Sequence, residues 1–464
     1  MGVHVSSHRL ARTVAMAGGL GVVSGTGLDG VYARLLQDGD RGARWAIEQF
    51  PDTAIAERLL SRYFKPDGRG GKPYRNLHKW IIEPRTDRQR EGLADLHELA
   101  VVSAFAEVTR ARHHHDGVVG INVLRKIAMP IPATIYGAML AGVDVVLTGA
   151  GSPDEMPRLL DALARHEEGV LSVKVLRDTP GAEHATRFAP AQVAGLPTGA
   201  PLRRPRFLAI VASVDLAAGL ASQPATRPDG FVVEGPTAGG HNAPPRGPWH
   251  PQTDPSYGER DGVDLAAIAA IGLPFWLAGS YGSPEGLRAA RSAGARGIQA
   301  GTVFALSRES GLTPELKSQV LGKVADGTVT VITDGSASPT GFPFKVHQLG
   351  GTLSDPAVRD ARQRRCDLGY LRQPVLQDGE LVYSCPAEPE PTLTSKGGRP
   401  QQATGRVCLC NALFAAAGLA QQRHDGYVEA PIFTGGADLD AVRRLSPDGD
   451  GYSATAAMSL INGE

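Results

Sequence analysis

GFVVEGPTAGGHNAPPRG, residues 230–247, joins a short apolar run to a cluster of glycines and a single histidine. The apolar run predicts a buried strand, which stops at Glu234. The glycines after it predict a backbone that turns sharply or lets a planar group come close. His241 follows them, and an imidazole can move protons near neutral pH. The alternative is a surface turn that carries an incidental histidine.

Strand-like and helix-like segments alternate on both sides of this stretch. Apolar runs predict strands, and apolar residues at three- and four-residue intervals predict the helices between them. Apart from the run before Glu234, the predicted strands lie at 20–27, 118–124, 143–151, 170–176, 207–213, 274–279 and 296–306. Repeated βα units of this kind form a parallel sheet with helices outside it. About eight strands without a reversal favour an α/β fold of the closed (β/α)8 or TIM-barrel type over an open doubly wound sheet.

The same pattern predicts the domain organisation. Residues 1–307 are expected to form the barrel, with a helical insertion at about 29–116. Residues 308–464 are expected to form a C-terminal subdomain, and all four cysteines lie in it. The first residues, MGVHVSS, resemble the end of a strand that enters a loop. Such a short strand fits a misassigned start or a truncated chain, and whether the true N-terminus lies upstream of Met1 stays open.

Charge and hydropathy narrow the classes of partner. The 48 basic residues balance the 48 acidic ones, and no long basic stripe occurs, so neither nucleic acid nor an anionic membrane is expected as the main partner. The sequence contains no run of about 18 apolar residues, so no membrane span is expected. The apolar N-terminal region lacks the form of a secretory signal, which predicts a cytoplasmic protein. The oligomeric state does not follow from the sequence.

Two glycine turns near the end of the predicted barrel indicate a phosphate site. Gly279 and Ser280 follow one predicted strand, and Gly301 and Thr302 follow the next. Each turn offers unpaired backbone N–H groups beside the start of a helix, which is a typical cradle for phosphate. In TIM barrels such a site commonly follows the seventh and eighth strands. The alternative is that both turns are plain barrel loops.

These motifs resemble those of the nitronate monooxygenase family, or 2-nitropropane dioxygenase-like proteins, which are FMN-dependent TIM barrels. GGLGVVSGTG, GINVL and LTGAGSP resemble its second to fourth strands, and EGPTAGGHNAP resembles its GGH motif. LAGSYG and IQAGTVF resemble its two flavin-phosphate turns. Two departures occur, because Ser280 replaces a usual second glycine and Val303 replaces a frequent arginine. Neither departure removes a backbone N–H group.

The resemblance implies a role for each matching residue. His241 corresponds to the catalytic base, which would take a proton from an acidic carbon before the flavin is reduced and then reoxidised by dioxygen. The phosphate of FMN would lie at the two turns. The remaining flavin contacts would come from Gly2, Val3, Asn122, Gly149, Gly151, Gly239, Gly240 and Gln299.

Two substrate classes stay open. The family resemblance implies a small nitronate, whereas EGPTAGGH, GAGSPDEMP and SPTGFP resemble a branch that contains an acyl-carrier-protein dehydrogenase/isomerase and enoyl-reductase-like proteins of fatty acid and polyketide metabolism. An acyl-thioester substrate needs a tunnel, and an acyl carrier protein needs a basic rim. Arg203, Arg204 and Arg206 are candidates for that rim, but a solvated loop is the favoured account of them. A barrel that binds acyl partners without flavin is a third possibility of another class.

The four cysteines are Cys366, Cys385, Cys408 and Cys410. Four thiolates suit a [4Fe–4S] cluster or a tetrahedral zinc ion, and the resembling branch carries a cluster on C-terminal cysteines. The spacing matches neither a compact ferredoxin motif nor a zinc knuckle. A cluster, zinc and unliganded thiols therefore all remain open.

Overall fold

The computed structural model describes residues 2–193, 195–196, 199–249 and 257–464. A parallel sheet of seven strands forms its centre, in the order β1-β2-β3-β6-β7-β8-β9. The strands are β1 (Gly21–Ser24), β2 (Val119–Leu124), β3 (Val145–Gly149), β6 (Arg206–Val211), β7 (Gly230–Glu234), β8 (Phe275–Ala278) and β9 (Gly297–Gln299). The predicted α/β class with a parallel sheet is therefore confirmed.

Each strand of the sheet is covered on both faces, as its near-continuous apolar sequence requires. Alternate residues of the strands form a small cluster on the inner face, with Leu147, Leu208 and Val232 among its members. The opposite face packs against the helices in the main core, which includes the fully buried Phe207 and Phe231. Consecutive strands therefore share one interior and one outer layer.

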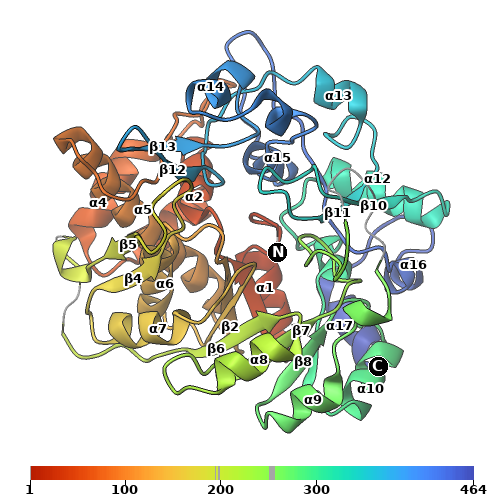
Figure 1. The fold of residues 1–464 in the computed structure, drawn as a ribbon. Helices are drawn as coiled ribbons and strands as arrows, with labels where there is room; N and C mark the ends of the chain where they lie inside the picture. Colours follow the sequence, from red (N-terminus) through yellow and green to blue (C-terminus); the bar gives the residue numbers. More distant parts are fainter. Residues whose placement is uncertain (1, 194, 197–198, 250–256) are drawn as a thin grey trace.

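Helices connect the strands and cover the outer face (Figure 1). The 26-residue helix α5 (Asp87–Arg112) joins β1 to β2, and Thr86 and Gln89 form the capping box at its start. The helices that precede or follow it up to β9 are α1 (His8–Met16), α2 (Leu28–Gln37), α3 (Arg41–Glu48), α4 (Thr53–Tyr63), α6 (Ile131–Leu140), α7 (Met156–Ala164), α8 (Val214–Ala221), α9 (Leu265–Ala270) and α10 (Pro284–Ser292).

The strand predicted at 170–176 does not join the sheet. Its first part, β4 (Gly169–Ser172), pairs antiparallel with β5 (Ala185–Phe188), and β3 pairs directly with β6. Ser172 and Lys174 alternate with apolar residues and are exposed, whereas a central parallel strand buries both faces. The prediction was wrong at this segment because the alternation indicates a half-exposed strand.

The two ends of the predicted barrel also differ from expectation. Residues 296–306 contain strand only in β9, and a short helix, α11 (Thr302–Ala305), follows it. The N-terminal residues 3–6 form a turn and a bend. Ser6 and Val5 accept hydrogen bonds from Ser24 and Gly311, at 2.9 and 2.8 Å, so this turn lies beside the carboxyl end of β1. Within the described residues the sheet has seven strands, and β1 and β9 are not paired with each other.

Residues after α11 form helices and two hairpins that lie across the rest of the molecule (Figure 1, cyan to blue). The hairpins are β10 (Val331–Asp334) with β11 (Phe344–His347), and β12 (Gln373–Gln377) with β13 (Glu380–Ser384). The helices are α12 (Pro314–Ala325), α13 (Pro356–Asp360), α14 (Glu390–Ser395), α15 (Leu409–Ala416), α16 (Asp440–Leu445) and α17 (Ala454–Asn462). The last of them, α17, returns to pack against α1 and α10.

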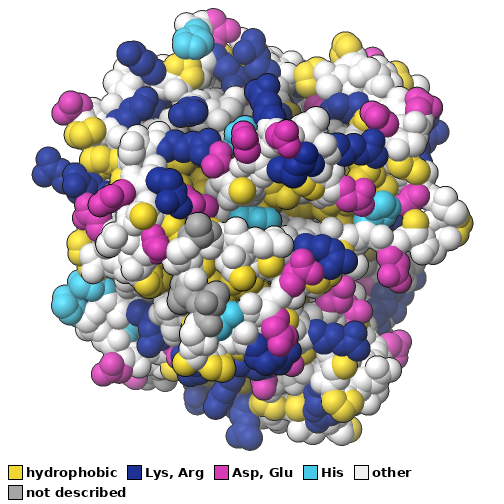
Figure 2. All heavy atoms as spheres, turned by 90° about the vertical axis from the view of Figure 1, so that its left-hand side faces the viewer, with side chains coloured by type: hydrophobic (Ala, Val, Ile, Leu, Met, Phe, Trp, Pro, Cys, Tyr) yellow, Lys and Arg dark blue, Asp and Glu magenta, His cyan; other side chains and the backbone are white. Residues whose placement is uncertain are grey.

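Acidic and basic side chains are interspersed over the face seen in Figure 2, without a large patch of one sign. This distribution agrees with the balance of 48 basic and 48 acidic residues. None of the helices in the described ranges is long and apolar enough to cross a membrane.

Candidate functional site at the carboxyl edge of the sheet

The carboxyl ends of the strands bring most of the predicted site residues to one edge. Asn122 lies in β2, and Gly149 ends β3. The loop after β7 carries the two glycines and His241, and the turns predicted to hold phosphate follow β8 and β9. Gly2 and Val3 belong to the N-terminal turn beside the end of β1. The segments predicted to share a site therefore share an edge.

Polar residues point inward near this edge. Glu234, Ala278 and Gln299 are neighbours across β7, β8 and β9 and lie on the inner face, because they alternate with outward-facing residues. Asn122 lies on the inner face of β2 and is buried, and its side-chain amide forms no hydrogen bond within the described part of the chain. Buried amides normally have a partner. Asn122 is therefore suited to bind a ligand group.

The loop that carries His241 is held by the C-terminal part of the chain. His241 forms an antiparallel bridge with Phe344, and Gly240 accepts a 2.9 Å hydrogen bond from the backbone N–H of Lys345. The imidazole lies between two rings, with centroid distances of 5.3 Å to Phe342 and 5.1 Å to Phe344. Asn242 adds a 2.8 Å side-chain bond to the carbonyl of Ala238. These contacts fix the backbone on both sides of His241.

Lys126 is the polar neighbour of His241. It lies in the turn after β2, and its ammonium nitrogen contacts Nε2 of His241. The same nitrogen lies 2.8 Å from the centroid of the Phe342 ring. Burial and then the charge of Lys126 lower the pKa of His241 to about 3, so the imidazole is neutral at neutral pH. Burial also lowers the pKa of Lys126 to about 6.

Glu234 is a second titratable group at the centre of the edge. Burial raises its pKa to about 7, because a carboxylate is poorly solvated there. The carboxyl group therefore holds a proton over part of the neutral range. A perturbed carboxyl group and a neutral imidazole at one edge of a sheet are typical of sites that transfer protons.

The turns after β8 and β9 expose backbone donors. Gly279 and Ser280 both have positive φ, 97° and 57°. The backbone N–H groups of Ser280, Tyr281 and Gly282 form no hydrogen bond within the described residues, and the same holds for those of Gly301, Thr302 and Val303. A side chain at Gly301 would meet nothing within 4 Å, so this turn borders open space. Such a cluster of free N–H groups suits an anion.

Residues 435–436 lie between the two predicted flavin-binding segments. A side chain at Gly239 would come within 2.4 Å of the nitrogen of Gly436, so Gly239 is needed for this close approach. The backbone N–H of Gly436 donates to the hydroxyl of Thr302 at 2.8 Å. A side chain at Gly279 would come within 2.9 Å of Ala238. Glycine at these positions therefore serves contacts within the chain as well as space for a ligand.

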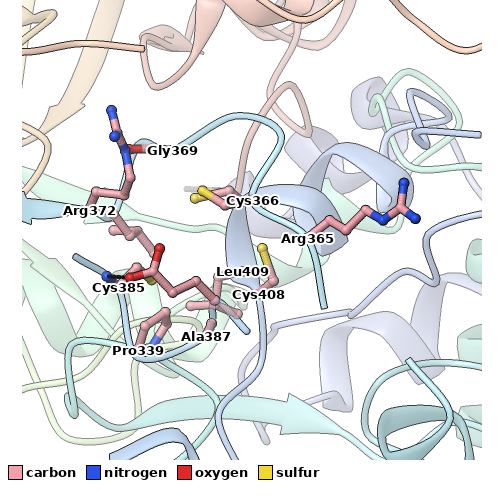
Figure 3. Close-up of a pocket in the computed structure, with 12 residues that line it drawn as sticks. Pro339, Arg365, Cys366, Gly369, Arg372, Cys385, Ala387, Cys408 and Leu409 are labelled. Atoms are coloured by element: carbon pink, nitrogen blue, oxygen red, sulfur yellow. Dashed lines mark hydrogen bonds between the residues drawn. The ribbon is translucent and has the colours of Figure 1, made fainter. Parts of the chain in front are cut away.

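All four cysteines line one pocket, although their spacing in the sequence is irregular (Figure 3). Cys385 directly follows β13, and Cys408 and Cys410 lie at the start of α15. The pocket contains about 270 Å³ that no protein atom fills, part of it open to solvent. Arg365 and Arg372 line it as well, and the guanidinium group of Arg365 points away from the thiols in Figure 3. The positive charges that act on the thiols include those of Arg372 on Cys366 and Arg362 on Cys408.

The thiols differ in acidity. A hydrogen bond from Cys410 lowers the pKa of Cys408 to about 7, whereas burial raises the pKa of Cys366 and of Cys385. Over the described ranges, no group of three or more His, Cys, Asp and Glu side chains is arranged to hold a metal ion. The four thiols therefore share a pocket without forming a preformed site for a single ion.

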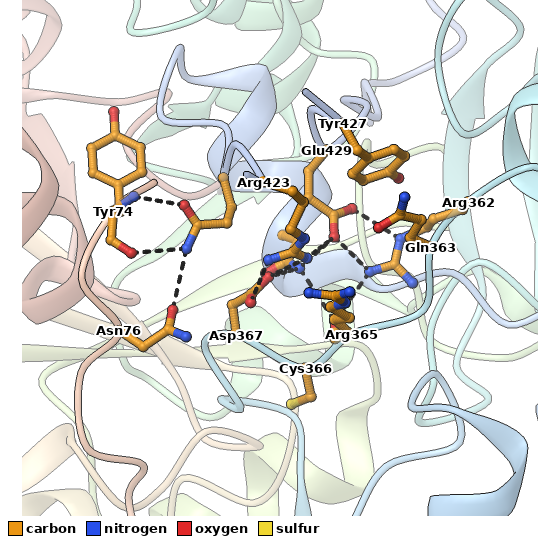
Figure 4. Close-up of polar contacts among 12 residues, drawn as sticks. Tyr74, Asn76, Arg362, Gln363, Arg365, Cys366, Asp367, Arg423, Tyr427 and Glu429 are labelled. Atoms are coloured by element: carbon orange, nitrogen blue, oxygen red, sulfur yellow. Dashed lines mark hydrogen bonds and ion pairs between the residues drawn. The ribbon is translucent and has the colours of Figure 1, made fainter. Parts of the chain in front are cut away.

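A buried polar network supports one wall of this pocket (Figure 4). Glu429 accepts hydrogen bonds from Arg362 and Arg423, and Arg423 also pairs with Asp367 at 2.7 and 2.8 Å. Arg362 further donates to the carbonyl of Arg365 at 3.3 Å. Residues 365 and 367 flank Cys366, so the network fixes the backbone that carries this thiol.

The three arginines proposed as a rim for an acyl carrier protein lie elsewhere. Arg206 begins β6, so Arg203 and Arg204 precede the strand and belong to the amino edge of the sheet, opposite the candidate site. Their charges are also paired, Arg203 with Asp144 and Arg204 with two aspartates. These arginines therefore do not form a basic rim at the candidate site, which was the less favoured of the two interpretations.

Sequence reasoning missed Lys126 and the two phenylalanines that flank His241. Lys126 lies two residues beyond β2, and the rule that carboxyl ends of strands meet at one edge would have included it. The phenylalanines lie about 100 residues further along the chain, and their pairing with the His241 loop has no local signature.

Comparison with known proteins bears on the part of the chain that contains this loop. Residues 194–338 match the family model of nitronate monooxygenase. This segment is similar to the nitronate monooxygenase family. A member of the family, the nitronate monooxygenase of Pseudomonas aeruginosa, is 34% identical over 119 residues, which are 25% of this chain and 32% of that protein. The match thus spans about a third of the length of the relative.

Two solved structures resemble the chain over most of its length. FabK from Thermotoga maritima is 16% identical with a TM-score of 0.46, covering 98% of this chain and 88% of that one. Nitroalkane oxidase from Streptomyces ansochromogenes is 14% identical with a TM-score of 0.47, covering 100% and 93%. Both TM-scores lie below 0.5, so neither likeness bears on function.

Proposed function

We propose that the chain is an FMN-dependent oxidoreductase of the nitronate monooxygenase type, with His241 as its base. The observation that carries this proposal is the convergence of His241, Asn122 and two turns with free N–H groups at the carboxyl edge of one parallel sheet. The consecutive strand order supports a (β/α)8-type arrangement, in which that edge carries the chemistry.

The residues at this edge fit a flavin phosphate and ring. The turns at Gly279–Gly282 and Gly301–Val303 offer free donors around open space, which suits a phosphate group. Asn122 offers a buried amide with no partner in the described chain. Bound FMN would supply the redox chemistry, namely uptake of a hydride or an electron and its delivery to dioxygen.

The side chains of the site handle the proton. His241, neutral at neutral pH, is free of a proton that would block its use as a base. The proposed substrate of this step is a neutral carbon acid such as a nitroalkane, whose C–H proton passes to the imidazole and whose electron pair moves onto the nitro group, which leaves the nitronate. Phe342 and Phe344 keep water from two sides of the ring. The peptide bonds of the His241 loop are held by β11, so the base keeps its orientation.

Spectra of the purified protein, followed by paired assays, test the proposal. Flavin absorbance with turnover of an alkyl nitronate would support it. Turnover of an acyl-carrier thioester in place of the nitronate would move the function to the acyl branch, and binding of acyl partners by a colourless protein would favour the flavin-free barrel. A colourless, phosphate-free protein overturns the assignment of FMN.

We expect Gly301→Ala to weaken FMN binding while leaving the fold intact. Gly301 has φ −117°, which alanine adopts, and the added methyl group would enter the open space of the turn. Crowding of this size costs about 1–3 kcal/mol, so the Kd for FMN should rise roughly tenfold or more. Fluorescence titration of the deflavinated protein measures the change.

Gly219→Ala is the matched control. Gly219 lies in α8, and a side chain there also meets nothing within 4 Å. The Kd for FMN should stay at its wild-type value in this variant. Equal affinities for wild type and Gly301→Ala would remove the turn after β9 from the proposed phosphate site.

We further propose that Cys366, Cys385, Cys408 and Cys410 bind a [4Fe–4S] cluster, with zinc as the alternative. Support comes from the pocket that the four residues share and from the arginines that would offset the charge of thiolates. A cluster spans more space than one ion, which agrees with thiols that surround a pocket without converging on a point. The resident group would supply electron transfer or structural cross-linking.

Protein purified without oxygen should contain iron and sulfide in equal amounts, and Cys408→Ser should lose most of both. Cys408 is buried, and its thiol has a lowered pKa, which favours the thiolate that binds a metal. Serine in its place removes this ligand without adding bulk. Elemental analysis and absorbance measure the loss, and Leu409→Met is a volume-conserving control in the same pocket. Zinc without iron would establish the alternative. The absence of both metals would show that the thiols are unliganded.

A further inference from the structure

Lys126 is a cation without a charged partner in the candidate site. No carboxylate forms an ion pair with it within the described residues, and its ammonium nitrogen contacts only an imidazole and an aromatic ring among the interactions of its side chain. The neighbouring Arg125 differs, because it pairs with Glu155 and donates to the carbonyl of Ser172 at 2.9 Å. Of two consecutive basic residues, one supports the backbone and the other faces the site.

A half-buried cation of this kind is costly unless an anion accompanies it. Burial accordingly lowers the pKa of Lys126 to about 6 in the site without a ligand, so that the amine gives up its proton more readily there. The rings of Phe342 and Phe344 and the imidazole of His241 offer no negative charge. A ligand anion that enters beside His241 would supply the missing counter-charge and raise the pKa of Lys126 again, which favours its ammonium form.

We propose that Lys126 binds the negatively charged oxygen that the substrate carries or acquires when His241 takes its proton. The inference rests on the proposed function of the site and names the substrate class as a carbon acid whose conjugate base is an oxyanion. A nitroalkane and an acyl thioester both meet this description, because their conjugate bases are a nitronate and an enolate. In contrast, a neutral hydrocarbon chain does not.

The proton transfer balances without a further reactant. The C–H bond breaks, the proton forms an N–H bond with His241, and the electron pair moves onto the nitro or carbonyl oxygen. The ammonium group of Lys126 then donates a charge-assisted hydrogen bond to that oxygen. A negative oxygen placed there also raises the pKa of His241, which makes the imidazole a stronger base only when substrate is present.

Binding of a stable anion tests the inference without turnover. Isobutyrate has the planar two-oxygen anion of a small nitronate, and isobutyramide is its neutral counterpart. We expect calorimetry on the purified wild-type protein to show at least roughly tenfold tighter binding of the anion, as a charge-assisted hydrogen bond provides. Lys126→Met should abolish this preference, and Lys126→Arg should keep part of it.

The outcomes separate this inference from the proposed function. Lys174→Met changes an exposed lysine and should bind both compounds as the wild type does. A preference for isobutyrate that survives in folded Lys126→Met, or that is missing from the wild type, overturns the role of Lys126. A protein without FMN that still prefers the anion contradicts the proposed oxidoreductase and leaves Lys126 as an anion-binding residue.

Discussion

His241→Ala should lower turnover of a neutral nitroalkane, whose C–H proton the base has to take, by roughly 10²- to 10⁴-fold and leave the bound flavin in place. This is the usual contribution of a positioned general base. The substitution removes the imidazole, whereas the loop keeps its backbone bridge to Phe344 and the bond between Gly240 and Lys345. Steady-state rates and the flavin spectrum of the same preparation measure the two effects separately.

Two further variants make the result decisive. His241→Asn retains a polar side chain that cannot act as a base, and it should be as slow as the alanine variant. His97→Ala removes another buried imidazole, between Trp80 and Phe188, and should affect stability more than rate. Turnover that persists in both His241 variants shows that another group takes the proton, and Glu234 would be the first to examine.

Glu429→Gln should lower the free energy of unfolding by about 3–5 kcal/mol. The carboxylate of Glu429 is fully buried and pairs with both Arg362 and Arg423. The neutral amide of glutamine removes this charge, so that Asp367, which pairs with Arg423, is the one carboxylate left in the network. Breaking a buried ion network in this way costs that much, because the remaining charge keeps its desolvation penalty. Urea unfolding at 25 °C measures the change.

An exposed ion pair provides the matched control. Glu380 pairs with Arg85 at 3.3 Å and is 73% exposed, so Glu380→Gln should change stability by less than about 1 kcal/mol. The network also holds the carbonyl of Arg365 next to Cys366, so the Glu429 variant should lose iron more readily. Equal stabilities of the two variants would show that the network around Glu429 contributes little to the fold.

The sequence predicted which segments share an edge of the sheet more accurately than it predicted the number of strands. Glycine turns after apolar runs mark the ends of parallel strands, and those ends share an edge whatever the exact number of strands. The strand predicted at 170–176 failed because its pairing partners, β5 and the segment around Val375, lie outside the sheet. Pairing between distant segments leaves no local pattern in the sequence.

Residues in non-local contacts were likewise beyond sequence reasoning. Nothing in the spacing of Lys126 and His241, 115 residues apart, indicates that they meet. The gathering of four irregularly spaced cysteines depends on β13, α15 and the loop at 366, and only the folded chain brings these together. Basic residues before a strand and after a strand look alike in the sequence, so the sequence left open whether Arg203 and Arg204 border the site or lie in a solvated loop.

The crossing of the C-terminal segments over the His241 loop determines when the site can form during synthesis. The loop takes its final conformation only after residues 342–345 pair with it and Gly436 reaches Gly239 and Thr302. Contacts of such long sequence separation form late, since the intervening chain must first be made and ordered. A nascent chain that has completed all seven strands therefore still lacks an assembled site, and capture of the flavin is expected near the end of folding.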